Sequence, residues 1–211
     1  MLKRLQLQIR AMGFTFYLPL IGYFLFIPLL AYVINLSIED VEERMYTIEE
    51  LCYQFVPMLS LLWLCMFHKE YVQGEGREIL ILGKGILAMS FVFWLMNIPC
   101  LYLQKQFFHH SDNLFQEMVV ISFMLCGLLF FLNFVLNNVS LSLLVIMLYI
   151  MLSNVDVYNF LALNNLEQPD RYYKYFFSIL SEGGGFSETA QGYIVAGILF
   201  WLIGMYKAKR L

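Results

Sequence analysis

The sequence predicts an all-α integral membrane protein with six transmembrane helices and both termini in the cytoplasm. Of its 211 residues, 61% are hydrophobic and 14% are charged, and the mean hydropathy is +0.69. A soluble domain averages about 45–50% apolar and about 25% charged residues, so this composition indicates lipid as the main solvent. Six spans of about 20 residues each leave no room for a separate catalytic domain. A soluble enzyme, a nucleic-acid-binding protein and a secreted disulfide scaffold are therefore excluded.

The apolar runs place the elements in order within a single transmembrane domain, residues 1–211. Residues 1–12 combine one apolar helical stripe with basic residues, which is typical of a helix lying in the membrane interface. The predicted spans are about 14–36, 51–67, 86–103, 114–136, 139–154 and 191–206.

The segments between the spans carry their own expectations. We expect an acidic loop over 37–50, a helix kink at Pro57 and a tight turn at Asn137-Asn138. The aromatic run Arg171–Leu180 is too short to span, so it predicts an interfacial or re-entrant helix on the outer side, before the last span.

The basic residues set the predicted orientation. With both termini inside, the inner segments hold nine Lys and Arg residues and the outer segments hold four. The opposite orientation reverses these counts and violates the positive-inside rule. Both termini are therefore predicted to be cytoplasmic.

The predicted spans lack charged groups. None has Asp, Glu, Lys, Arg or His in its interior, whereas ion-coupled carriers normally keep an ionisable group there. The energy for any transport must then come from another protein. Asn97, Ser122, Asn133 and Tyr149 are candidate lining residues for the path of an amphipathic solute; the alternative is that they only join helices by hydrogen bonds.

No catalytic residue is predicted. Gly185-Phe186-Ser187 superficially resembles the serine motif of an intramembrane protease, but no His follows His110 to serve as its base. The glycines between Gly76 and Lys84 lack the spacing and the Ser or Thr of a phosphate-binding loop, so the chain has no ATP site of that kind.

No metal site is predicted either. His109 and His110 are adjacent and project in different directions, and apart from Asp112 no further ligand is near. The four cysteines form no C-x-x-C motif. Whether Cys52 and Cys100 form a disulfide is left open.

The segment after the second span is the most informative one. It mixes charged residues with the aliphatic run Ile79–Leu82, and glycines flank it. A short helix of this kind docks on a soluble partner beneath the membrane, or the segment is simply a solvated loop. Composition does not separate these two readings.

The chain resembles the membrane subunits of type-2 ATP-binding-cassette exporters. The likeness lies in the basic N-terminal helix, the six-span layout, the short turn after the fourth span and the long aromatic segment before the sixth. At the level of sequence it lies in the segment from Glu70 to Leu80.

The resemblance implies that the segment after the second span is a coupling helix seated on a cytoplasmic ATPase subunit. The residues it assigns to ATPase docking are Glu70, Glu75, Arg77 and Glu78, supported by Lys3, Arg4 and Arg10. It also implies a second permease subunit, in a homodimer or heterodimer. ATP and Mg²⁺ would be bound by the partner, and this chain would hold no cofactor and would not be an enzyme.

The expected function is export of a hydrophobic or amphipathic solute, such as a peptide, a lipid-like compound or a drug, across a bacterial plasma membrane. One alternative is the small-molecule-binding membrane subunit of an energy-coupling importer. Another is an intramembrane hydrolase, which the absence of an intramembrane acid or His disfavours. The cargo and the direction of transport stay open.

Overall fold

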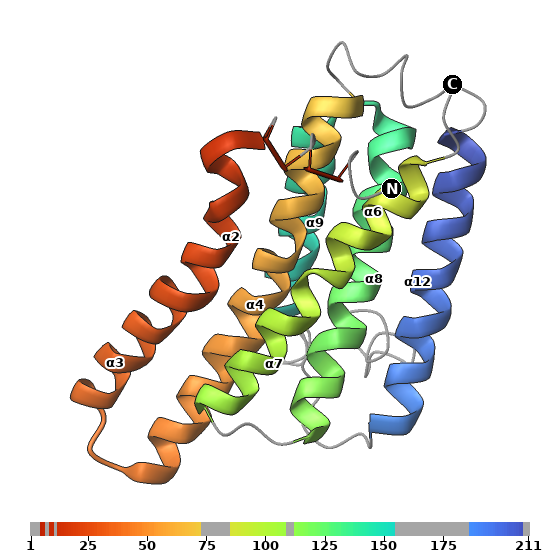
Figure 1. Cartoon of the computed structure of the whole chain (residues 1–211). Coiled ribbons are helices and arrows are strands. Elements are labelled where there is room, and N and C mark those ends of the chain that lie inside the picture. The colour runs from red at the N-terminus through yellow and green to blue at the C-terminus, as the bar shows by residue number, and fades with distance from the viewer. Residues whose placement is uncertain are drawn as a thin grey trace.

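The chain folds into a helical bundle. The computed structural model describes residues 5–6, 9–10, 12–72, 85–108, 112–154 and 186–208, which form helices and turns with no strand among them. Figure 1 shows long helical segments that run alternately up and down the bundle, with the start of η1, the end of α4 and the end of α12 at the same end. The elements are η1 (Gly13–Tyr17), α2 (Leu18–Ile21), η2 (Gly22–Phe26), α3 (Ile27–Ser37), α4 (Val41–Val72), α6 (Ile86–Leu95), α7 (Asn97–Phe108), α8 (Asp112–Leu136), α9 (Val139–Asn154) and α12 (Phe186–Ala208).

Within the described ranges, three helical segments are long and apolar enough to cross a membrane. They are Gly13–Ser37, Ile86–Phe108 and Asp112–Leu136, and Phe55–Lys69 and Val139–Ile150 are shorter apolar helices. Large apolar side chains of α3, α9 and α12 are exposed on the outside of the bundle. An apolar exterior around a packed interior is the arrangement that lipid favours, so the fold is that of a membrane protein.

The expected acidic loop over 37–50 is wrong, because α4 already begins at Val41. The Asp40 side chain accepts a hydrogen bond from the backbone N–H of Glu42 at 3.0 Å, as a helix N-cap does. Glu42 and Glu43 then lie in the first turn, where negative charge complements the helix dipole. The acidic residues therefore start the helix instead of preventing it, and the helix continues through Pro57.

The third predicted span, 86–103, is interrupted and longer than expected. The α-helix breaks at Met96 between α6 and α7, and α7 runs on to Phe108. Pro99 explains the break, because it has no N–H for the carbonyl of Leu95 and its ring crowds that carbonyl. The Asn97 side chain donates to other carbonyls beside the break, as described below.

The turn between α8 and α9 is where it is expected. Asn137 has a φ of 54°, a left-handed conformation that asparagine tolerates better than most residues. The Asn138 side chain then accepts a hydrogen bond from the backbone N–H of Leu141 at 3.1 Å and caps α9.

Glycines allow α8 and α12 to approach closely along their length. A Cβ atom built on Gly197 would lie 2.7 Å from the Phe123 ring and 3.2 Å from the Met124 Cα, and one built on Gly204 would lie 2.5 Å from the Phe130 ring. Conversely, the Trp201 ring of α12 packs on Gly127 of α8. Aromatic rings thus fill the hollows that glycines leave, which is how small residues join helices when lipid surrounds them.

We predict that Gly204→Ala lowers the free energy of unfolding in detergent by about 1–3 kcal/mol, because the new methyl group overpacks the α8–α12 contact. The matched control is Gly192→Ala in the same helix, where a Cβ atom meets nothing within 4 Å. Thermal unfolding of the two purified variants checks this. Equal melting temperatures for both would show that the glycine is not needed for close packing.

Candidate functional site

The described interior contains two buried polar clusters, and we name the first the Asn97 hub. The Asn97 side chain is fully buried at the break between α6 and α7. Its Nδ2 donates to the carbonyls of Phe93 (3.2 Å) and Trp94 (3.1 Å) beside the break, and to the Ser60 carbonyl of α4 (3.2 Å). Its Oδ1 accepts from the Tyr23 hydroxyl at 3.1 Å. One amide therefore solvates the carbonyls beside the break and joins η2, α4 and α6.

The hub extends to a second proline. In η2, a π-helical turn, the N–H of Ile27 bonds to the carbonyl of Gly22 rather than to that of Tyr23. The next residue, Pro28, has no N–H to offer, so the backbone leaves the Tyr23 carbonyl without a donor. The Gln104 side chain of α7 donates to that carbonyl through Nε2. A buried glutamine thus completes the hydrogen bonding of the first helical segment.

The second cluster, which we name the His68 cluster, joins three helices. His68 of α4 is fully buried, and its Nε2 lies 2.9 Å from the Ser90 Oγ of α6. Its Nδ1 is hydrogen-bonded to the side-chain amide of Asn133 in α8. The Phe130 and Phe134 rings of α8 pack on the imidazole, with ring centroids 5.5 and 6.0 Å away. Both imidazole nitrogens therefore have partners inside an aromatic enclosure.

The sequence places His68 in the polar segment after the second span, and the structure corrects this. Phe55–Lys69 forms one apolar helix that includes His68, and the side chain points into the bundle with no exposed surface. The expectation of spans without any ionisable group in the interior is therefore wrong for this helix. In the sequence the apolar run stops at Phe67 because His68, Lys69 and Glu70 follow it, and residue type alone does not show that the imidazole is buried.

The imidazole–serine contact has the atoms of a Ser–His pair, with an amide on the second nitrogen. Such pairs activate a serine as a nucleophile when a substrate carbonyl can reach it. Here Ser90, His68 and Asn133 all have 0% exposed surface. No substrate reaches Ser90 in this conformation, so the arrangement acts as a joint between helices.

The four candidate path residues lie in different surroundings. Asn97 and Asn133 belong to the two clusters, and Ser122 of α8 accepts a hydrogen bond from the Trp94 indole at 3.2 Å. Tyr149 lies on α9 with part of its surface exposed. The first three use polar groups on neighbouring helices, which is the alternative role that the sequence leaves open. A solute path along them stays a prediction.

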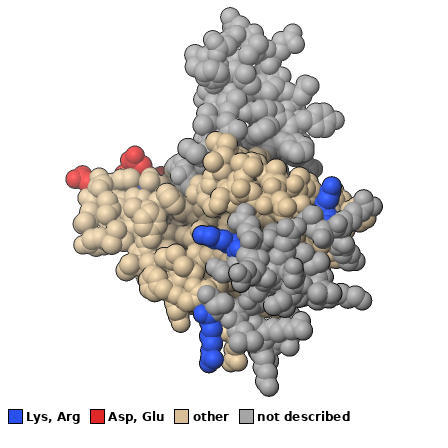
Figure 2. Space-filling view, turned by 90° about the horizontal axis from the view of Figure 1, so that it is seen from above, with Lys and Arg blue, Asp and Glu red and all other residues tan. Residues whose placement is uncertain are grey.

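Most of the predicted ATPase-docking residues lie outside the described residues: Lys3, Arg4, Glu75, Arg77 and Glu78. Glu70 lies in the last turns of α4, and Arg10 is exposed in the N-terminal region. Figure 2 views the bundle from the end at which α4 and α12 finish. It shows basic side chains on the described surface, with acidic side chains at one edge. Lys69 and Lys207, which are exposed at the ends of α4 and α12, contribute to this basic character.

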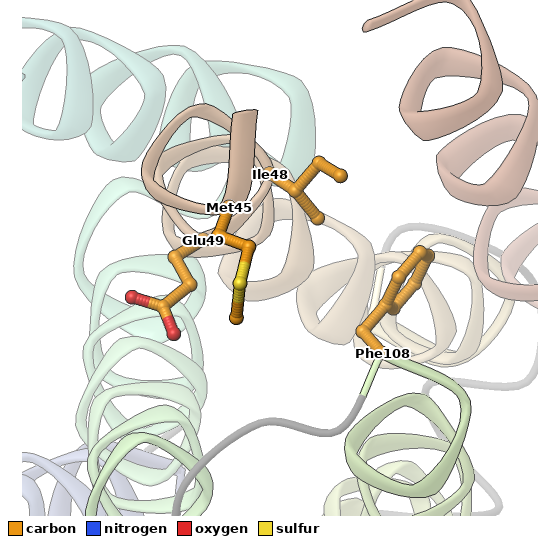
Figure 3. Close-up of a pocket in the computed structure, with 4 residues that line it drawn as sticks. All are labelled: Met45, Ile48, Glu49 and Phe108. Carbon is orange, nitrogen blue, oxygen red and sulfur yellow. The ribbon is translucent and has the colours of Figure 1, made fainter. Parts of the chain in front are cut away.

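A small hollow lies at the opposite end of the bundle. Met45, Ile48 and Glu49 of α4 and Phe108 of α7 line it, and its free volume is about 50 Å³. Figure 3 shows the Glu49 carboxylate directed away from Ile48 and Phe108. Ligand pockets usually measure about 300–1,000 Å³, so this hollow is too small for a drug-sized solute.

Among the residues that the structure describes, no group of three metal-ligating side chains occurs. His109 and His110 lie outside the described residues, and Asp112 forms an ion pair with Lys105. Cys52 and Cys100 are both buried thiols, so the disulfide left open by the sequence is absent.

Comparisons with known proteins add no relative. No protein-family model matches the chain, and searches of curated proteins and of solved structures return no significant match.

Sequence reasoning missed His68 and Gln104 as buried partners. The sequence did hold a signal for a residue such as Gln104. Pro28 has no N–H, so a carbonyl one turn before it in the helix needs a donor from another segment. His68 gave no such signal, since nothing local distinguishes a buried imidazole at the end of an apolar run from a solvated one.

We predict that Gln104→Leu lowers the free energy of unfolding by about 1–3 kcal/mol, because the buried Tyr23 carbonyl loses its donor. The same substitution should cost less in a Pro28→Ala background, where residue 28 regains an N–H. A double-mutant cycle of thermal unfolding measures this coupling. Equal costs in both backgrounds would show that Gln104 does not compensate for Pro28.

Proposed function

We propose that this chain is the permease subunit of an ATP-driven exporter for a hydrophobic or amphipathic solute. In this proposal the chain crosses a bacterial plasma membrane six times, with both termini in the cytoplasm. It pairs with a second permease subunit, and a separate ATP-binding-cassette ATPase supplies the energy. The likeness of the 70–80 segment and of the layout to type-2 exporters motivates the proposal.

The observation that carries the proposal is the chemistry of the buried interior. The buried polar residues of the described part comprise Ser60, His68, Ser90, Asn97, Gln104, Ser122, Asn133 and Ser142. They include one imidazole and no carboxylate, ammonium or guanidinium group. The two nitrogens of that imidazole already bond to neighbouring helices. An interior of this kind supports a transporter whose energy comes from a partner rather than from an ion gradient.

The arrangement of the helix ends agrees with docking at one face. The end of α4, the start of η1 and the end of α12 lie at the same end of the bundle (Figure 1), and this end carries the exposed Arg10, Lys69 and Lys207. The first turn of α4, with Glu42 and Glu43, lies at the other end. A basic face beside the cytoplasm follows the positive-inside rule and favours the orientation proposed from the sequence.

The alternatives are weaker on the same observations. An importer subunit that captures a small molecule needs an enclosed pocket, and the described hollow beside Phe108 is small. The His68–Ser90 contact is an observation in favour of an intramembrane hydrolase. However, both side chains are completely buried, so a substrate has no access to them.

We predict that Glu75→Gln combined with Glu78→Gln weakens association with the proposed partner ATPase, because docking charges are lost. Melting of the permease alone should be unchanged. The matched control is Glu42→Gln with Glu43→Gln, which removes two carboxylates at the other end of α4.

The measurement is co-purification of the tagged permease with the ATPase, together with the ATP hydrolysis rate of the complex in nanodiscs. We expect about a tenfold loss of affinity for the docking variant, since two partly desolvated charge contacts disappear, and none for the control. Failure of the wild-type chain to bind any ATP-binding-cassette ATPase would overturn the proposed function. Equal binding by both double variants would overturn the docking assignment alone.

A further inference from the structure

The His68 cluster lies at the base of the segment proposed to dock on the ATPase. That segment leaves α4, which ends at Val72, and returns to α6, which begins at Ile86. His68 is near the end of α4 and Ser90 is near the start of α6, and the contact between Nε2 and Oγ is 2.9 Å. One hydrogen bond therefore ties the two flanks of the segment together.

The same imidazole ties both flanks to α8. Asn133 bonds to Nδ1, and the Phe130 and Phe134 rings enclose the imidazole. Beside it, the Phe67 ring of α4 packs on the Phe93 ring of α6, with centroids 5.0 Å apart. Swapping the oxygen and nitrogen of the Asn133 amide would still leave each imidazole nitrogen with one partner, so the joint holds in either tautomer.

Phe130 continues the contact to the last helix. Its ring packs on His68 at 5.5 Å and on Trp201 of α12 at 4.9 Å, and it fills the space that Gly204 leaves. The imidazole, the ring and the indole thus form one line of contacts from α4 through α8 to α12.

We propose that His68 is a positioning residue that makes the inner ends of α4, α6 and α8 move as one body when the segment 73–84 is pushed. This inference rests on the proposed function, which supplies the push. In apolar surroundings water does not replace a lost hydrogen-bond partner, so separating these helices is costly while the cluster is intact. Without the His68 cluster, the end of α4 and the start of α6 move apart, and a displacement of the segment 73–84 is not transmitted to α8.

The first experiment tests whether the His68 cluster holds α4 and α8 together in the permease alone, in nanodiscs. Spin labels on Lys69→Cys and Val135→Cys, both exposed positions, report the distance between α4 and α8. The native cysteines are buried, so the labels react at the new sites. Asn133→Leu should raise the population of separated helices about tenfold by removing one buried hydrogen bond. The matched control is Gln104→Leu, which removes a buried amide whose hydrogen bond joins α7 to η2 and should leave this distance distribution narrow.

A milder variant guards against misfolding. Ser90→Ala deletes one hydroxyl, and labels on Lys69→Cys and Ala88→Cys report the α4–α6 distance. We expect this distribution to widen as well. Unchanged distributions in both Ser90→Ala and Asn133→Leu would overturn the inference, whatever the ATPase does.

The second experiment adds the ATPase and traps it with ATP and vanadate. Labels on Met45→Cys and Gln116→Cys, exposed near the far ends of α4 and α8, report the transmitted movement. The wild-type chain should show a nucleotide-dependent shift in this distance. Asn133→Leu should bind the ATPase and allow ATP hydrolysis at rates within about twofold of wild type, yet lose the shift, because binding and transmission are separate free-energy terms. Gln104→Leu should keep it.

The outcomes separate the two proposals. A shift retained by both Asn133→Leu and Ser90→Ala overturns the role of His68 and leaves the proposed function standing. Failure of the wild-type chain to bind the ATPase overturns the proposed function, and the transmission through His68 with it.

Discussion

The structure depends on one constraint: a backbone group surrounded by apolar side chains or lipid must find its partner within the chain. Pro28 and Pro99 each remove a backbone donor from a helical segment, and a buried side-chain amide donates to backbone carbonyls beside each irregularity. Gln104 serves the Tyr23 carbonyl, and Asn97 serves the carbonyls of Phe93 and Trp94. The irregular helices are therefore stabilised by a few buried amides that reach across from a neighbour.

Side-chain shape joins the helices where hydrogen bonds do not. Gly127, Gly197 and Gly204 each receive an aromatic ring from the opposite helix, which gives α8 and α12 a close fit. The His68 cluster adds polar joints at the inner ends of α4, α6 and α8. Shape and hydrogen bonding meet at Phe130 of α8, whose ring packs on both His68 and Trp201. The α8 helix contacts α4, α6, α7, α9 and α12.

Hydropathy predicts the helical elements well because apolar runs have a strong and local cause. The range 139–154 coincides with α9, and 114–136 lies within α8. The start of α4 is missed because acidic residues look like a loop until the Asp40 cap is considered. The partners of His68 and Asn97 are not predictable from sequence, since they lie on other helices and depend on how those helices pack. Only the residue types, buried amides among apolar neighbours, indicate that partners exist.

The α8–α12 contact also bears on biosynthesis. The ribosome completes α8 at Leu136 but must add α9 and the segment after it before α12 begins at Phe186. Until then, Phe123, Gly127 and Phe130 have no α12 to pack against, and this face of α8 meets lipid or the insertion machinery. The nascent chain therefore acquires its tightest helix pair last, and translation that stops before Phe186 leaves a membrane-inserted chain with an unfilled aromatic face for quality-control proteases to recognise.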